Sequence, residues 1–215
     1  MRRAILGGKF SQKGMRVSLF FISLLGLLVA GPIGFSMTTK TKNQVERYGL
    51  SSTRQYELFR KILTFERTWK KKQLAHLTVA LLYEKSYELS VWIKEDFVQA
   101  IEAQSTIEGL PVRLLEIPVE EIKNLSNLFS QENIAFLYIT PLKPATIKNQ
   151  LKKILALCRQ FKIATFTGEI TYVDLGVAIG LGVVDQKPQV FINLQAAKEQ
   201  GLEFSSQLLR MSLIK

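Results

Sequence analysis

Beyond residue 57, short segments rich in apolar residues alternate with longer stretches in which apolar residues recur every three or four positions. The short segments have the length of strands, and the one at 77–83 is an unbroken apolar run, which suits a strand covered on both faces. The longer stretches have helical spacing. The predicted strands are 77–83, 111–117, 133–139 and 162–166. The predicted helices are 58–65, 89–105, 120–129 and 144–161, and Ser51 or Ser52 could cap the first of them. This alternation predicts parallel strands with helices on both faces of the sheet.

The last part of the chain follows a different pattern. Apolar runs at 177–184 and 189–194 are joined by a short polar segment, which predicts a hairpin of antiparallel strands. A short helix at 195–200 ends at Gly201, and Ser205 or Ser206 begins a final helix that extends to Leu213. The predicted fold class is therefore α/β. We expect a mostly parallel, doubly wound sheet of the Rossmann or flavodoxin type that ends in an antiparallel hairpin.

The beginning of the chain has the pattern of an export segment. Basic residues precede a run from Val17 to Phe35 that contains no charged residue, and small residues follow near its end. This pattern is typical of a signal peptide over residues 1–36, or of an uncleaved anchor, since about 19 apolar residues can just span a bilayer. Both alternatives place the rest of the chain in the periplasm. Residues 37–55 are predicted to be a basic polar linker, and residues 56–215 a single domain.

The formal net charge of +11 arises largely near the export segment. Residues 1–36 contain five basic residues and no acidic one, so 24 basic and 18 acidic residues remain, an excess of six. Further basic residues cluster between Lys40 and Lys72, where anionic lipid would attract them. Aromatic residues are not interleaved with this cluster, as a nucleic-acid stacking platform would require. We therefore expect no nucleic acid as a partner.

The sequence lacks the groups that most catalytic and metal sites need. It contains one histidine, His76, and one cysteine, Cys158, which cannot form an intramolecular disulfide or a clustered metal site. No G-x-S-x-G motif occurs, so a serine hydrolase is not indicated. The alternative of an enzyme depends on the carboxylates Glu169 and Asp174, which lie after the fourth strand. We expect no catalytic residue, and the protein is predicted not to be an enzyme.

Cofactor motifs are also missing. Gly180 and Gly182 do not open a helix and lack the third glycine of a dinucleotide fingerprint, so close packing in a strand explains them better, together with Gly176. We expect no cofactor and no metal. Open α/β sheets bind ligands at the carboxyl ends of their strands. The residues predicted to form such a ligand cleft are Tyr83, Glu84, Thr140, Pro141, Thr167, Gly168 and Glu169.

The C-terminal quarter resembles the closing motif of the YfiR family of periplasmic proteins. The resemblance is carried by FINL at 191–194, AA at 196–197, GL at 201–202 and SSQLLR at 205–210. The motif has a structural interpretation of its own: Asn193 can bond its turn backbone, Gly201 suits a left-handed helix stop, and Ser205 or Ser206 can cap a helix. We therefore interpret Asn193, Gly201, Ser205 and Ser206 as determinants of the fold.

The resemblance implies a periplasmic regulator that holds an inner-membrane diguanylate cyclase inactive, with effects on cyclic-di-GMP and biofilm. It implies a Rossmann-like fold and a homodimer as one arrangement. The partner would be an inner-membrane signalling protein, either a diguanylate cyclase or a sensor kinase, and a small-molecule ligand is a further candidate. Two features depart from the family: Cys158 has no second cysteine to pair with, and Gln189 and Val190 stand where a basic residue is frequent. The alternative function is a periplasmic solute-binding or sensor module of a transporter or histidine kinase.

Overall fold

The computed structural model describes residues 49–72 and 74–215, which belong to one compact unit. The expected signal peptide at 1–36, and most of the expected linker at 37–55, lie outside the described residues. Helix α2 begins at Ser52, and Leu50, Ser52 and Gln55 are buried. The end of the segment expected to be a linker is therefore part of the folded domain.

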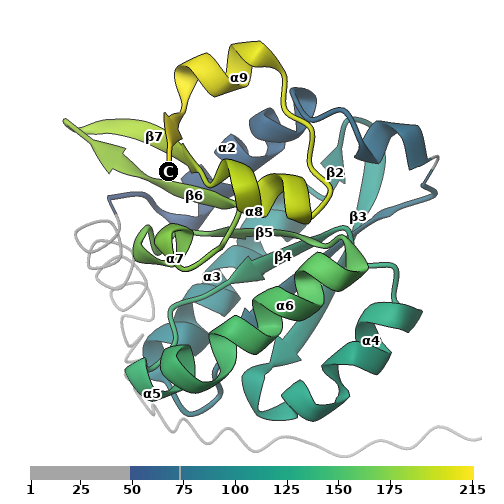
Figure 1. The fold of residues 1–215 in the computed structure, drawn as a ribbon, viewed down its shortest axis with the longest axis vertical. Helices are drawn as coiled ribbons and strands as arrows, with labels where there is room; N and C mark the ends of the chain where they lie inside the picture. Colours follow the sequence, from purple (N-terminus) through teal and green to yellow (C-terminus); the bar gives the residue numbers. More distant parts are fainter. Residues whose placement is uncertain (1–48, 73) are drawn as a thin grey trace, which may run out of the picture. The chain divides into compact units, whose positions relative to one another are not determined.

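One sheet runs through the domain in the strand order β2-β3-β1-β4-β5-β6-β7-β8 (Figure 1). The strands are β1 (Leu77–Tyr83), β2 (Thr106–Ile107), β3 (Leu110–Pro118), β4 (Phe136–Ile139), β5 (Ala164–Thr167), β6 (Ile179–Val184), β7 (Lys187–Ile192) and β8 (Leu213–Ile214). From β3 to β6 neighbouring strands are parallel, whereas the pairs β6–β7 and β2–β3 are antiparallel. The predicted fold class is confirmed, because a mostly parallel sheet is followed by the antiparallel hairpin.

Helices cover both faces of the sheet. They are α2 (Ser52–Thr64), α3 (Glu88–Ala103), α4 (Leu125–Gln131), α5 (Pro144–Thr146), α6 (Lys152–Phe161), α7 (Thr171–Asp174), α8 (Leu194–Glu199) and α9 (Ser206–Met211), with 3-10 turns η1 (Trp69–Lys72) and η2 (Val119–Asn124) and a π turn η3 (Ile147–Leu151). Figure 1 shows α4 and α6 in front of the sheet and α2 and α3 behind it. Within the described residues, no helix is both long and apolar enough to span a membrane.

Alternate residues of the strands serve two separate apolar cores. Behind the sheet, Phe59 of α2 stacks on Phe166 of β5 with ring centroids 3.9 Å apart, and Phe97 of α3 stacks on Tyr138 of β4 at 4.0 Å. In front of the sheet, α4 and α6 pack on Leu137 and on the other strand residues whose side chains point to that face. Strands with apolar side chains on both faces must be covered on both faces, which is why the apolar segments of the sequence predict this layered arrangement.

Several details differ from the sequence-based predictions: β2 was not expected, and the helix expected at 120–129 is the 3-10 turn η2 followed by α4. Three further differences have a local explanation. Strand β4 begins at Phe136 and not at residue 133, because Asn133 adopts a left-handed conformation with φ of 45°. Leu213 lies in the short strand β8 and not in the last helix, which ends at Met211. Gly176 has φ of 109° and lies in the turn before β6, so its conformation and not strand packing explains it.

The other two glycines are packed as expected. A Cβ atom at Gly180 would lie 2.5 Å from a methyl group of Val173, and one at Gly182 would lie 2.8 Å from Ile170. Both neighbours belong to the short segment that covers this part of the sheet, so any side chain at either glycine would push α7 away. Close packing is therefore confirmed for Gly180 and Gly182.

Candidate functional site

The carboxyl ends of β1, β4 and β5 meet at one edge of the sheet, because these three strands are parallel neighbours. We call this the carboxyl edge. The chain runs from β1 outward to β3 on one side and then returns to β4 on the other side. The strand order therefore reverses between the neighbouring strands β1 and β4. Doubly wound sheets bind their ligands at the carboxyl ends of the two strands where the order reverses. The residues predicted to line a ligand cleft are thus brought to this edge.

Glu84 lies at that reversal point and is 5% exposed. One of its carboxylate oxygens accepts a hydrogen bond from the backbone amide of Lys143 at 2.9 Å, and the other accepts one from the Ser86 hydroxyl at 3.2 Å. The Lys143 ammonium donates to Ser86 at 3.0 Å and lies 3.9 Å from the carboxylate. Glu84 therefore joins the loop after β1 to the loop after β4.

Hydroxyl groups close the space between the same two loops. Ser90 of α3 lies 2.6 Å from the Thr140 hydroxyl, and its oxygen accepts a hydrogen bond from the Glu84 amide at 2.8 Å. Thr140 also donates to the carbonyl of Leu82, and Thr167 donates to the carbonyl of Ile139. These buried polar groups have protein partners, as buried polar groups usually do. The hydroxyls of Thr140 and Thr167 therefore hold the strands together.

Gln55 of α2 covers the end of β5. Its side-chain oxygen accepts a hydrogen bond from the Tyr138 hydroxyl at 2.9 Å, and its nitrogen donates to the Leu50 carbonyl at 3.1 Å. A Cβ atom at Gly168 would lie 2.5 Å from the same oxygen. Gly168 is thus the residue that lets α2 approach the sheet closely.

The remaining residues of the predicted cleft have separate surroundings. Tyr83 points toward α3, where the Lys94 ammonium lies 5.2 Å from the centre of its ring. Pro141 is buried, and the amide of the next residue, Leu142, donates to the Tyr172 hydroxyl at 2.8 Å. Burial raises the pKa of Tyr172 to about 12. The amide of Glu169 donates to the Thr167 hydroxyl at 3.0 Å. Ligand binding at this edge stays a prediction.

A second region at the far end of the sheet has the opposite character. Large apolar side chains are exposed there around the last strand, with exposed fractions between 42% and 54%. They are Leu175, Leu194, Met211, Leu213 and Ile214, and we call them together the β8 edge. Strand β8 pairs with β7 on one side and stands last in the strand order, so its outer side faces no strand of the described sheet (Figure 1). This region combines apolar surface with an open strand edge.

Polar contacts hold the β8 edge in place. The Lys215 amide donates to the Ile192 carbonyl at 2.9 Å, and the Lys215 ammonium lies 3.2 Å from the Asp174 carboxylate. The Gln189 side chain donates to the Met211 carbonyl at 3.0 Å. The last residues of the chain are therefore fixed between α7 and the hairpin, although their apolar side chains remain exposed.

The motif residues build the elements around this edge. Asn193 caps α8 by accepting a hydrogen bond from the Ala196 amide at 2.9 Å, and it donates to the Val173 carbonyl of α7. Gly201 follows α8 with φ of 83°, as expected for a left-handed helix stop. Ser205 caps α9 through the Leu208 amide, whereas Ser206 is the exposed first residue of that helix. Of the two serines considered, Ser205 is the cap.

Besides Gln55 and Ser90, two further buried polar side chains were not identified in the sequence. The Glu66 carboxylate is 1% exposed and accepts hydrogen bonds from the amides of Thr68, Trp69 and Glu203 and from the Thr68 hydroxyl. The Gln200 side chain accepts from the amide and hydroxyl of Thr165, both at 2.8 Å. Each connects segments far apart in sequence. Their partners are mostly backbone groups, which leave no pattern in the sequence.

The candidate catalytic groups are dispersed. Cys158 is fully buried in α6, and burial raises the pKa of its thiol. His76 is exposed just before β1, at the opposite end of the strand from the carboxyl edge. Asp174 pairs with Lys215, and Glu169 accepts a hydrogen bond from the Thr171 hydroxyl. The described part of the chain contains no group of three His, Cys, Asp or Glu side chains that could hold a metal.

The element order and the sheet define a doubly wound α/β domain. The polar side chains Glu84, Thr140 and Thr167 at its carboxyl edge form hydrogen bonds with other groups of the protein. A family model described as YfiR/HmsC-like matches residues 58–212. The chain belongs to the YfiR/HmsC-like family, so the resemblance stated from the C-terminal motif is confirmed. A comparison with curated proteins gives no match.

Solved structures of similar fold are remote in sequence. A conserved domain protein from Vibrio cholerae aligns with a TM-score of 0.56 and 15% identity, over 77% of this chain and 61% of its own. An ABC domain in complex with L-Trp from Streptococcus pneumonia aligns with a TM-score of 0.49 and 18% identity, over 65% of this chain and 55% of its own. An open, ligand-free substrate-binding protein with adhesive properties from Clostridium difficile aligns with a TM-score of 0.47 and 14% identity, over 65% of this chain and 54% of its own. The chain thus spans less than two thirds of each, and the Vibrio likeness concerns the fold alone.

Proposed function

We propose that this protein is an exported regulator that acts in the periplasm by contacting an inner-membrane signalling partner, a diguanylate cyclase. Membership of the YfiR/HmsC-like family supports a regulatory role in cyclic-di-GMP signalling in general. The uncharged run at 17–35 supports export. The protein does no chemistry in this proposal, and its effect comes entirely from binding.

The observation that carries the proposal is the β8 edge. Exposed apolar side chains gathered on a folded domain commonly mark a protein-binding site. Here Leu213 and Ile214 of β8 are exposed, as are Leu175, Leu194 and Met211 in neighbouring segments, and the outer backbone groups of β8 can pair with an extended segment. Added strands gain affinity from main-chain hydrogen bonds and specificity from alternate side chains. The β8 edge is therefore the surface that we assign to the partner.

Binding alone can restrain an enzyme that has an active and an inactive conformation. A protein that binds the inactive conformation more tightly shifts the population toward it, by as much as the difference between the two affinities. A hundredfold difference, about 2.7 kcal/mol, would lower the ratio of active to inactive cyclase by a factor of about 100. Such a difference is within reach of two or three buried apolar side chains.

The test is to measure cyclic-di-GMP in cells that lack the gene and in cells complemented with variants of the β8 edge. Deletion should raise the level, and the wild-type gene should restore it. The double variant L213S/I214S should fail to restore it although the protein is folded and exported. Val184→Ser is the matched control, because Val184 is an exposed apolar residue (39%) at the hairpin tip and outside the β8 edge.

Other outcomes would contradict the proposal. An unchanged level of cyclic-di-GMP in the deletion strain would contradict the regulatory role. If the L213S/I214S variant restored the wild-type level, the β8 edge would not be the surface that contacts the partner. Loss of a dimer in that variant, with repression intact, would assign the edge to self-association. A solute-binding module would instead show a higher melting temperature with a small ligand. Detection of the intact chain in the cytosolic fraction would contradict export.

A further inference from the structure

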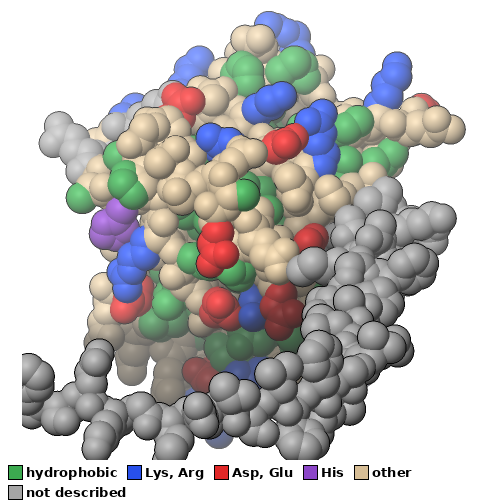
Figure 2. Space-filling view, turned by 180° about the vertical axis from the view of Figure 1, so that it is seen from behind, with side chains coloured by type: hydrophobic (Ala, Val, Ile, Leu, Met, Phe, Trp, Pro, Cys, Tyr) green, Lys and Arg blue, Asp and Glu red, His purple; other side chains and the backbone are tan. Residues whose placement is uncertain are grey.

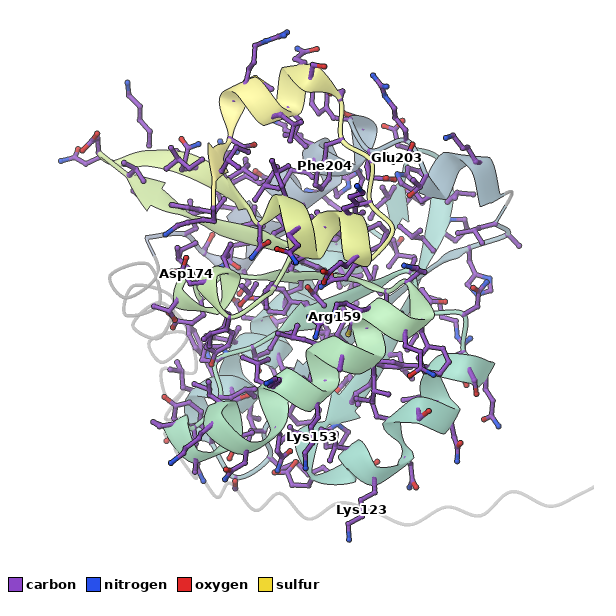
Figure 3. The ribbon with its side chains drawn as sticks, in the orientation of Figure 1. Lys123, Lys153, Arg159, Asp174, Glu203 and Phe204 are labelled. Carbon is purple, nitrogen blue, oxygen red and sulfur yellow. The ribbon has the colours of Figure 1, made fainter. Side chains whose placement is uncertain are left out.

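The outer surface of the helical segment 144–162 carries positive charge without any compensating acid of its own. This segment comprises α5, η3 and α6 and ends at Lys162, and its charged residues are Lys148, Lys152, Lys153, Arg159 and Lys162. The four lysines are exposed and Arg159 is half-buried. We call this the α6 surface. Figure 3 shows Lys153 and Arg159 on the side of α6 that faces the viewer.

Neighbouring elements neutralise this charge only in part. Helix α4, which packs beside α6, contains no charged residue. The turn η2 adds Lys123 at its edge together with Glu120 and Glu121, of which Glu121 pairs with Lys85 (Figure 3). The carboxylate of Glu199 in α8 lies 3.6 Å from the Arg159 guanidinium. This ion pair does not include any of the four lysines. The α6 surface therefore stays strongly positive.

The opposite face of the sheet carries charges of both signs. Helix α3 contains Glu88, Glu95, Asp96 and Glu102 against Lys94, whereas α2 on the same face contains Arg54, Arg60 and Lys61 against Glu57. Figure 2 shows Lys and Arg side chains among Asp and Glu side chains on this face. The α6 surface, on the other face, contains basic residues without an acid of its own. An extended anionic surface attracts the α6 surface more strongly than the mixed face and so orients the domain.

From these observations we infer that the α6 surface binds the anionic phospholipid headgroups of the membrane beside which the protein acts. This inference rests on the proposed export to the inner membrane. The apolar run at 17–35 is separated from the described domain by residues 36–48, which can span at most about 45 Å. A domain attached to the bilayer through that run would stay within reach of the headgroups.

The chemistry of the α6 surface favours lipid over nucleic acid. Each basic residue close to an anionic bilayer strengthens binding by about fivefold, so several lysines together give a substantial effect that salt would screen. Single-stranded nucleic acid also needs exposed aromatic rings for stacking. The exposed large apolar side chains of the described residues are Leu, Val, Met and Ile only. Electrostatic contact with headgroups needs no such rings.

The test measures energy transfer from a dye on the full-length chain to an acceptor on lipid headgroups. Cys158 is fully buried, so a cysteine introduced at exposed Ala156 on the α6 surface can be labelled selectively. Gln99 is exposed on α3, on the opposite side, and gives the matched labelling site. Both labelled chains are reconstituted into vesicles that contain phosphatidylglycerol, and into vesicles of phosphatidylcholine alone.

In phosphatidylglycerol vesicles we expect about twofold more transfer from position 156 than from position 99, and loss of the difference in about 0.5 M salt or in phosphatidylcholine. The triple variant K148E/K152E/K153E should also lose it. The control K187E/K198E/R210E changes the net charge equally at exposed residues that lie outside both the α6 surface and the basic cluster between Lys40 and Lys72, and it should keep the difference.

Equal transfer from the two positions in phosphatidylglycerol vesicles would overturn the inference, as would an unchanged difference in the K148E/K152E/K153E chain. Binding to a DNA duplex that this triple variant loses, without any lipid effect, would assign the surface to nucleic acid. The regulatory role is judged separately by cyclic-di-GMP levels. Failure of the lipid contact would therefore leave the proposed function standing.

Discussion

The carboxyl edge and the β8 edge are both candidate binding regions. Polar side chains at the carboxyl edge form hydrogen bonds within the protein, whereas apolar side chains at the β8 edge remain exposed to solvent. At the carboxyl edge, Glu84, Thr140 and Thr167 bond to the protein itself, and Gln55 covers the end of β5. At the β8 edge, apolar side chains such as Leu213 and Ile214 are more than 40% exposed, and the strand has one open side.

This difference shows that the strand order predicts where a ligand site would lie, but does not determine whether the polar groups there are free to bind a ligand. The reversal point between β1 and β4 is where a ligand would bind in a related fold. In this protein Glu84 and the hydroxyls of Ser90 and Thr140 lie at that point, and they form hydrogen bonds with other protein groups. These polar groups connect the strand ends, and ligand binding beside them stays a prediction. The exposed apolar side chains lie at the other end of the sheet.

Of the two regions, the carboxyl edge is where a substitution is expected to have the larger effect on stability. Gly168→Ala would place a methyl group 2.5 Å from the Gln55 oxygen and displace that side chain. The bonds from Tyr138 to Gln55 and from Gln55 to the Leu50 carbonyl would be lost, so we expect the free energy of unfolding to fall by about 2–3 kcal/mol. Urea unfolding measures the change.

A double-mutant cycle sharpens this prediction. In a Gln55→Ala background the added methyl group meets no amide, so Gly168→Ala should cost less than half as much as in the wild-type protein. Equal costs in the two backgrounds would show that Gln55 does not close the edge.

The second prediction concerns the pH dependence of stability that arises from two buried tyrosines. Burial raises the pKa of Tyr172 and of Tyr56 to about 12, against an ordinary value of about 10. The folded state therefore holds these protons more tightly than the unfolded state. Their contribution to stability is complete below pH 10 and is lost as the pH rises from 10 toward 12. Urea unfolding across this range should show the decline.

Tyr172→Phe tests the contribution of one group. This variant removes the titrating hydroxyl, so its stability should decline less steeply above pH 10 than that of the wild-type protein. It also removes the acceptor for the Leu142 amide, so it should be less stable near neutral pH by about 1–2 kcal/mol. An identical slope above pH 10 would show that water reaches Tyr172 in the folded state.

Periodicity predicted the order of the main strands and helices, although it missed the two-residue strands β2 and β8. The run at 77–83 corresponds to β1 with the same bounds. Local chemistry predicted the roles of Asn193, Gly201 and Ser205, since these depend on neighbours within a few residues. Such features are visible in the sequence because their causes are local.

Features that depend on distant partners could not be predicted. Gln55 bonds to Tyr138 and packs against Gly168, and nothing in the sequence indicates which helix covers which strand end. Strand β8 was missed for another reason. Its two residues are too few to show alternation, and Leu213 continued the helical spacing of the preceding leucines. The exposure of Leu213 follows from the sheet edge, which only the folded structure reveals.

A smaller effect is expected in the hairpin that leads to the β8 edge. Asp185 and Gln186 both have positive φ, 47° and 62°, and they form the two-residue turn between β6 and β7. Such a turn favours glycine at its second position. Gln186→Gly should therefore stabilise the protein by about 0.5–1 kcal/mol, measured by thermal unfolding. Destabilisation would show that the Gln186 side chain contributes contacts that outweigh its strained backbone.

The smallest effect on stability is expected at the β8 edge itself. Leu213 is 43% exposed, so Leu213→Ser removes little buried apolar surface and should change the free energy of unfolding by less than about 0.5 kcal/mol. The same substitution at a buried leucine such as Leu81, which is 0% exposed, should cost at least 3 kcal/mol, or about six times as much. A large loss of stability in Leu213→Ser would mean that this side chain supports the fold. A small loss together with lost repression would instead mean that its apolar surface is kept for a partner, because the folded domain gains almost nothing from it.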